Sequence, residues 1–196
     1  GSSLWPLMEK YPDRAFDVGI AEQHSITFAA GLAAEGKKAF AAIYSTFLQR
    51  AYDQVIHDVC IQKLPVVFCI DRAGLVGADG PTHHGLYDIS FLRNVPNIIV
   101  SSPMNEEELR DMMFTASNYD ECAWAIRYPR GRATGMDVPE GFKSMDIGKG
   151  ECLRKGDEIA ILSFGPFGNY VMDAADDLEE EGINVGHYNM RFAKPL

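Results

Sequence analysis

Short apolar runs alternate with helical patterns along this chain, and that alternation is the feature that most constrains its fold. The runs are bounded by turn residues and occupy residues 15–19, 38–44, 65–71, 97–102 and 122–129. A continuous apolar run of this length is typical of a strand that is buried on both faces of a parallel sheet. We therefore expect an α/β domain with a mostly parallel sheet and helices on both faces.

The segments between these runs have helical patterns. Residues 22–36 are rich in alanine, and residues 46–62 carry an apolar stripe at four-residue spacing, formed by Phe47, Ala51, Val55 and Val59. A further helix is expected after Asn105, because Asn105 and Glu108 have the spacing of a capping box.

The composition changes near residue 132, where Gly, Pro and charged residues become frequent. We interpret residues 1–133 as one domain, 134–150 as a linker and 151–196 as a single βαβ unit. One unit of roughly 45 residues cannot bury a core by itself. It must either dock on the first domain or be cut short, and we expect that it is cut short.

The charge and cysteine usage exclude several classes of protein. The formal net charge of −10 argues against nucleic acid or an anionic membrane as a partner. No apolar run approaches the ~20 residues of a membrane span. The cysteines form no C-x-x-C pair, and we expect reduced thiols in a cytoplasmic protein. They are Cys60, Cys69, Cys122 and Cys152.

Polar side chains follow each apolar run, and open parallel sheets bind ligands beyond the carboxyl ends of their strands. In chain order these side chains are Glu22, Gln23 and His24; Tyr44, Ser45, Thr46, Phe47 and Arg50; Asp71 and Arg72; Ser101, Ser102 and Pro103; and Arg127, Tyr128 and Arg130. Acids, bases and aromatic rings are thus expected to converge on one edge of the sheet. The sequence predicts a ligand site there.

Several of these residues have two interpretations. Glu22 either stabilises the start of a helix through the helix dipole or accepts a hydrogen bond from a bound heterocycle. His83 and His84 are adjacent, which is poor geometry for one metal ion, and they are either polar surface or include one acid/base. Arg127 and Arg130 are either a solvated strand end or a phosphate clamp.

Two glycine-containing segments are candidates for nucleotide or phosphate binding. The loop of residues 74–85 matches neither G-x-G-x-x-G nor the P-loop, and its glycines are more typical of tight turns and close approach to a ligand. The segment "GPFG" at 165–168 could contact a phosphate at a helix start, although a plain turn is the simpler interpretation.

The motifs "DVGIAEQH", "YSTFLQRAYDQV", "DRAGLVGADGPTHHG", "RYPRG" and "MRFAKPL" together resemble the 1-deoxy-D-xylulose-5-phosphate synthase family of transketolase-like, thiamine diphosphate-dependent enzymes. The resemblance runs from about Tyr11 to Leu196 and implies a fold of the transketolase pyrimidine-domain type. It implies a transferase that decarboxylates pyruvate and joins the two-carbon unit to D-glyceraldehyde 3-phosphate. The product, 1-deoxy-D-xylulose 5-phosphate, feeds isoprenoid, thiamine and pyridoxal synthesis.

The resemblance also assigns the cofactor-facing residues. Glu22 would hydrogen-bond N1′ of the aminopyrimidine and thereby favour the tautomer that accepts a proton from the thiazolium ring. Phe47 would stack on the aminopyrimidine, and Gln23 and His24 would hold Glu22 in place. The implied cofactor-binding set is Glu22, Tyr44, Phe47 and Arg50.

The remaining implied roles concern the substrates. His83 and Asp79 would face the reacting groups together with Glu22, and His83 would carry a proton. Arg72 and Arg130, with Tyr44, would bind the phosphate of the aldehyde substrate.

The family's diphosphate- and Mg²⁺-binding domain, with its Gly-Asp-Gly…Asn motif, is not recognisable in this chain, and we expect no metal site among its residues. We therefore expect an N-terminal domain to be missing, a homodimeric parent enzyme, and a chain that is inactive alone. Two alternatives remain open. One is another transketolase or a 2-oxo acid dehydrogenase β chain, and the other is a non-catalytic, flavodoxin-like interaction domain.

Overall fold

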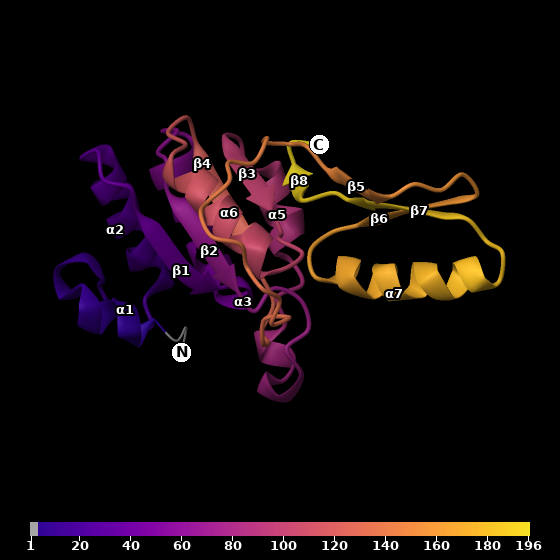
Figure 1. Ribbon diagram of the computed structural model, residues 1–196. Helices are drawn as coiled ribbons and strands as arrows, with labels where there is room; N and C mark the ends of the chain where they lie inside the picture. The colour runs from indigo at the N-terminus through magenta and orange to yellow at the C-terminus, as the bar shows by residue number, and fades with distance from the viewer. Residues whose placement is uncertain (1–3) are drawn as a thin grey trace.

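The computed structural model describes residues 4–196 and contains two sheets, and Figure 1 shows the smaller one at the right of the larger one. The larger sheet has the strand order β1-β2-β4-β3-β8. Its strands are β1 (Phe40–Tyr44), β2 (Val67–Asp71), β3 (Ile98–Ser101), β4 (Ala123–Arg127) and β8 (Phe192–Lys194). The first four are parallel and β8 is antiparallel to β3, so the predicted α/β class with a mostly parallel sheet is confirmed.

Helices cover both faces of this sheet. One face packs against α2 (Glu22–Ala34), the helical segment of residues 45–60 and α5 (Asp88–Asn94). The other face packs against α6 (Glu106–Ser117), where Met112 and Ala116 join the cluster around Trp124. The continuous apolar strands β2, β3 and β4 are buried along almost their whole length because they are covered from both sides.

The helical segment after β1 is continuous but irregular. It consists of α3 (Ser45–Leu48), the 3₁₀ turn η2 (Gln49–Ala51), α4 (Tyr52–Gln54) and the π-helical η3 (Val55–Cys60). The predicted stripe is nevertheless buried at Ala51, Val55 and Val59. Phe47 is only half-buried, because it lies where the segment leaves the sheet.

The strand predicted at residues 15–19 is wrong. After α1 (Trp5–Lys10) and the 3₁₀ turn η1 (Pro12–Arg14), this segment is irregular and pairs with no strand of the described chain. Gly19 has φ +68°, and its N–H donates to Asp17 Oδ1 at 2.9 Å. A local turn therefore satisfies the backbone where the apolar pattern alone suggested a ladder.

The C-terminal unit contains the predicted βαβ elements β6 (Ile159–Ser163), α7 (Phe167–Glu180) and β7 (Val185–Asn189). An additional strand that the pattern did not predict, β5 (Glu151–Arg154), pairs antiparallel with β7 and gives the order β5-β7-β6.

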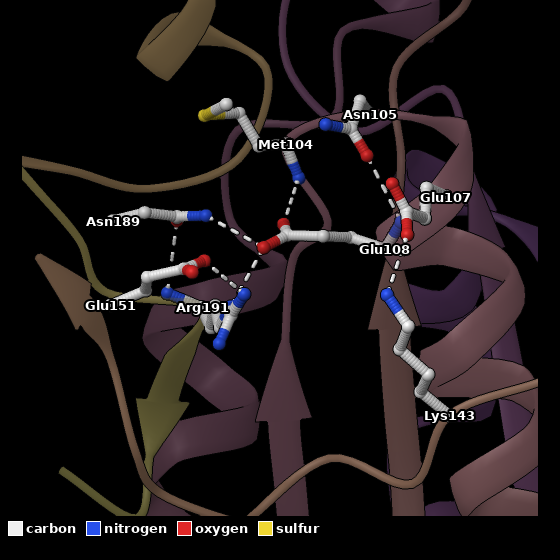
Figure 2. A network of polar contacts seen from close by, with 8 residues as sticks. All are labelled: Met104, Asn105, Glu107, Glu108, Lys143, Glu151, Asn189 and Arg191. Carbon is white, nitrogen blue, oxygen red and sulfur yellow. Dashed lines mark hydrogen bonds and ion pairs between the residues drawn. The ribbon is translucent and has the colours of Figure 1, made fainter. Parts of the chain in front are cut away.

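This unit docks on the first one, and whether it is also cut short stays a prediction. Strand β8 joins the larger sheet, and Figure 2 shows the polar network beside it, centred on Glu108 of α6. The Glu108 carboxylate accepts hydrogen bonds from Asn189 Nδ2 at 2.9 Å, Arg191 Nε at 2.7 Å and the Met104 backbone N–H at 2.7 Å. Asn105 caps α6 as predicted by accepting from the Glu108 N–H at 3.0 Å, but Glu108 reaches Met104 rather than Asn105.

The predicted linker, residues 134–150, contains no helix or strand but is attached to α6. Glu106, the first residue of α6, accepts from the backbone N–H groups of Thr134, Gly135 and Met136 and from the Thr134 hydroxyl, at 2.7–3.1 Å. The Thr134 hydroxyl bond and these N–H groups lower the pKa of Glu106 to about 2. Phe142 stacks on Phe114 of α6 with ring centroids 5.2 Å apart.

The cysteines are free, and only Cys152 is exposed. Burial raises the pKa of the Cys60 and Cys69 thiols to about 12, so both are inert, apolar core residues. Across residues 4–196 no helix combines the length and the apolar composition that crossing a bilayer requires.

Candidate active site

The carboxyl ends of β1, β2 and β4 meet at one edge of the larger sheet, at Tyr44, Asp71 and Arg127. Tyr44 is in register with Asp71, and Ile70 with Arg127, so the residues that follow these strands start from neighbouring positions. The structure thus brings together several of the polar side chains that the sequence placed at one edge.

Glu22 begins α2 and contacts Arg50 of η2. The Arg50 Nη1 lies 3.2 Å from Glu22 Oε1 and 3.3 Å from Oε2. The Glu22 side chain is 13% exposed and that of Arg50 56%, so the carboxylate is largely enclosed while the guanidinium reaches the surface. The enclosed carboxylate is held by one charged donor and keeps lone pairs for a further donor.

An aromatic pair lies next to this contact. The Tyr44 and Phe47 rings are stacked, with centroids 5.6 Å apart and planes inclined by 17°. The Arg50 guanidinium lies 4.8 Å from the Phe47 centroid, and the His83 ring meets Phe47 edge-on at 5.3 Å. Such a pair offers a flat apolar surface to a planar ring.

Two arginines share one carboxylate on the other side of Tyr44. Asp79 Oδ2 lies 2.8 Å from Arg72 Nε and 3.0 Å from Arg130 Nε. The hydrogen bond from Arg72 and the charge of Arg130 hold the pKa of Asp79 below its usual range, so Asp79 is ionised at neutral pH. Arg72 also lies 3.8 Å from the Tyr44 centroid, and the Arg130 side chain is 46% exposed. Arg130 therefore has donors free for an anion.

The loop that carries Asp79 and His83 is closed at its base by glycines. Gly74 and Gly85 exchange backbone hydrogen bonds of 2.8 Å in both directions. A Cβ at Gly85 would lie 2.4 Å from the carbonyl oxygen of Arg72, which excludes any side chain there. Close approach to a ligand was expected of these glycines, whereas Gly85 approaches the chain itself.

Arg72 has a left-handed backbone, with φ +57°. This conformation is unfavourable for a residue with a long side chain, and it is stabilised locally because the Arg72 N–H donates to Asp71 Oδ1 at 2.7 Å. Backbone strain of this kind is concentrated at binding and catalytic sites.

The two adjacent histidines differ in position. His84 Nδ1 accepts from the Val76 N–H at 3.2 Å and so belongs to the interior of the loop. His83 Nδ1 lies 2.9 Å from Thr82 Oγ1, and the ring faces Phe47. Of the two, His83 is the one whose ring lies next to the aromatic pair. Nowhere in residues 4–196 do three His, Cys, Asp or Glu side chains come together to hold a metal ion.

Gln23 and His24 do not hold Glu22, contrary to expectation. Both are exposed, and His24 stacks on Phe28 with centroids 5.9 Å apart. Successive helical residues are turned by about 100°, so neighbours in sequence point away from Glu22. Arg50, a residue distant in sequence, contacts Glu22 instead.

Arg127 is not part of an open phosphate clamp. Its Nε lies 2.8 Å from Asp88 Oδ2, and the Asp88 side chain is 0% exposed. The sequence pattern does not reveal this role of Asp88, because an aspartate at the start of a helix is explained by the helix dipole alone. The serines after β3 also make internal hydrogen bonds: Ser101 accepts from Trp124 Nε1 at 2.8 Å, and Ser102 Oγ donates to the Arg127 carbonyl at 3.1 Å.

The "GPFG" segment forms the turn into α7, and its glycines lie against the first unit. A Cβ at Gly165 would lie 2.4 Å from Ser102 Oγ, and a Cβ at Gly168 would lie 2.4 Å from Met104 Sδ. The glycines allow the C-terminal unit to approach the edge of the larger sheet.

Two protein-family profiles match this chain. The profile described as "Transketolase, pyrimidine binding domain" matches residues 2–135, and "Transketolase, C-terminal domain" matches residues 148–196. Curated proteins named 1-deoxy-D-xylulose-5-phosphate synthase from Cytophaga hutchinsonii and Aquifex aeolicus are each 57% identical to this chain over its whole length. The chain spans 31% of the length of each of these relatives.

Solved structures of transketolases are similar to this chain. A structure titled "Split gene transketolase, inactive beta4 tetramer" is 30% identical, with a TM-score of 0.78 over 94% of this chain and 59% of that one. A Pichia stipitis transketolase complexed with a seven-carbon sugar phosphate has a TM-score of 0.74 at 22% identity, covering 89% of this chain and 26% of that one. The latter shows a shared fold.

Proposed function

This chain belongs to the transketolase family through its pyrimidine-binding domain, and on that premise we propose that it is part of a 1-deoxy-D-xylulose-5-phosphate synthase. The observation that carries the proposal is one unbroken series of contacts. It runs from the enclosed carboxylate across the aromatic pair to the two arginines, through Glu22, Arg50, Phe47, Tyr44, Arg72, Asp79 and Arg130. The relatives that carry this enzyme's name are similar to the chain along its whole length.

The residues present fit the aminopyrimidine half of thiamine diphosphate. The enclosed Glu22 carboxylate can accept a hydrogen bond from a protonated ring nitrogen, and Phe47 can stack on the ring. Tyr44 and Arg50 lie next to Phe47 and would line the same site. When bound, the cofactor supplies the electron sink for decarboxylation of pyruvate.

The arginines fit the phosphate of D-glyceraldehyde 3-phosphate. Asp79 holds Arg72 and Arg130 side by side, and their remaining donors can bind a phosphate in the bidentate manner that arginine favours. The Tyr44 hydroxyl can add a further donor. His83, on the loop and next to Phe47, would carry a proton to or from the substrate oxygen.

The proposed function also assigns the domains of this chain and the partners that would complete the enzyme. Mg²⁺ and the diphosphate would be bound by a separate N-terminal domain, and the complete enzyme would be a cytoplasmic homodimer. Residues 1–133 would be the pyrimidine-binding domain, 134–150 the linker and 151–196 the start of the C-terminal domain. The chain without its diphosphate-binding domain would be inactive.

The test is product analysis on the enzyme assembled from this chain and the diphosphate-binding domain. With pyruvate and D-glyceraldehyde 3-phosphate we expect 1-deoxy-D-xylulose 5-phosphate and CO₂. Glu22→Gln should lower the rate by about 100-fold or more, because an amide stabilises the protonated ring less than a carboxylate does.

The matched control is Glu35→Gln, at the other end of α2, where the side chain is exposed and should not affect the rate. A product formed from a ketose donor instead of pyruvate would indicate a transketolase. An unchanged rate in Glu22→Gln would contradict the proposed site.

A further inference from the structure

Arg127 and Asp88 form a buried ion pair beside the candidate active site, and none of the roles proposed above uses it. Arg127 ends β4 and Asp88 begins α5. The contact consists of two hydrogen bonds, from Arg127 Nε to Asp88 Oδ2 at 2.8 Å and from Arg127 Nη2 to Asp88 Oδ1 at 3.4 Å. Burying both charges is costly unless they are closely paired, so the pair strongly favours one arrangement of the two elements.

The pair fixes one end of the loop that carries Asp79 and His83. The other end is fixed at Ala73, whose N–H donates to the Tyr128 carbonyl at 3.0 Å. The two ends of residues 74–87 are therefore attached to consecutive residues of one strand end, Arg127 and Tyr128.

The C-terminal unit closes over the same pair. The Phe164 ring centroid lies 5.8 Å from the Arg127 guanidinium carbon. Ser102, which donates to the Arg127 carbonyl, is also the residue against which Gly165 packs. The loop, the sheet and the C-terminal unit thus meet at Arg127.

We propose that Arg127 is a positioning residue which, through Asp88, holds the loop of residues 74–87 against the strand ends of the larger sheet. The loop in turn keeps Asp79 and His83 against the arginines and the aromatic pair. The holding of the loop stands on the geometry alone, whereas its consequence for turnover rests on the proposed function.

Hydrogen exchange of this chain, followed by mass spectrometry, tests the holding of the loop without any reaction. Arg127→Gln should speed exchange at the Gly74, Val76 and Gly85 amides about tenfold or more, because these amides bond within the closed loop. Arg127→Lys, which keeps the charge but not the fork, should give a smaller increase. Peptides from β1 should be unchanged. Arg93→Gln, an exposed position of α5, is the matched control.

Unaltered exchange of the loop in a folded Arg127→Gln variant would overturn the proposal. If that variant loses exchange protection throughout the chain, Asp88→Asn decides, since it keeps the shape of the side chain and removes its charge. Loop exchange in Asp88→Asn equal to that of the wild type would then overturn the proposal, and local acceleration would support it.

A second readout separates positioning from general loss of stability. In the assembled enzyme, Arg127→Gln should raise KM for D-glyceraldehyde 3-phosphate about tenfold and leave KM for pyruvate nearly unchanged, because the loop carries Asp79 between the two arginines. Partial unfolding would instead lower kcat with both KM values unchanged. That result would contradict the positioning role, and a wild-type enzyme that fails to make the product would refute only the proposed function.

Discussion

Two groups of charged residues lie near the same edge of the larger sheet, and they are built differently. In the candidate site, Arg50 and Arg130 each contact one carboxylate and are about half exposed. In the docking network of Figure 2, Glu108 is 11% exposed and accepts hydrogen bonds from three donors, while Arg191 contacts both Glu108 and Glu151. Arginines available to a ligand thus keep donors free, whereas an arginine that joins two parts of the protein uses its donors on internal carboxylates.

The largest expected effect comes from breaking the docking network. Glu108→Ala should lower the free energy of unfolding by about 3 kcal/mol, because it leaves Arg191 and Asn189 without their shared acceptor in a mostly buried place. Urea denaturation of this chain measures the change.

The neighbouring Glu107 provides the control. It pairs with Lys143 at 3.3 Å, and the Lys143 side chain is exposed. Glu107→Ala should cost less than about 1 kcal/mol. Equal costs for the two variants would show that the network does not stabilise the docked arrangement.

An intermediate effect, on function rather than stability, is expected in the site. Arg130→Gln should raise KM for D-glyceraldehyde 3-phosphate about 10- to 100-fold in the assembled enzyme, since a charged hydrogen bond to the phosphate is lost. Its unfolding free energy should stay within about 0.5 kcal/mol of the wild type. Steady-state kinetics and urea denaturation provide the two values.

Arg132→Gln, two residues further on and exposed, should leave both quantities unchanged. A large loss of stability in Arg130→Gln with normal KM would place Arg130 with the docking residues and break the distinction between the two groups.

The smallest effect concerns the attachment of the linker at Glu106. Folding lowers the pKa of this carboxyl from its usual 4.5 to about 2, so its stabilising contribution is fully present above pH 4.5 and is lost as pH falls through about 2. The Gly135 amide resonance should therefore titrate with a midpoint near pH 2. In Glu106→Gln this titration should be absent, and a wild-type midpoint near 4.5 would contradict the attachment.

Much of the fold could be predicted from the sequence because strand and helix signals are local. The runs that became β1, β2, β3 and β4 carry the continuous apolar pattern of doubly covered strands, and Asn105 carries its cap within three residues. The segment at 15–19 has a similar pattern but no neighbouring strand, and its glycine turns the chain. Strand β8 is only three residues long and depends wholly on β3 for its pairing.

In the candidate site, too, some features could be predicted from the sequence and others depend on the tertiary structure. That Tyr44, Arg72 and Arg127 gather at one edge follows from the strand ends, because parallel strands present their carboxyl ends together. Glu22 joins them through α2, since no strand precedes it. The sequence by itself thus determined the fold class and the place where polar side chains collect. Which arginine is saturated and which is free was decided only by tertiary structure, since Asp88 and Asp79 reach their partners from elements distant in sequence. Long-range pairing of charges depends on how the elements pack, and no local pattern encodes it.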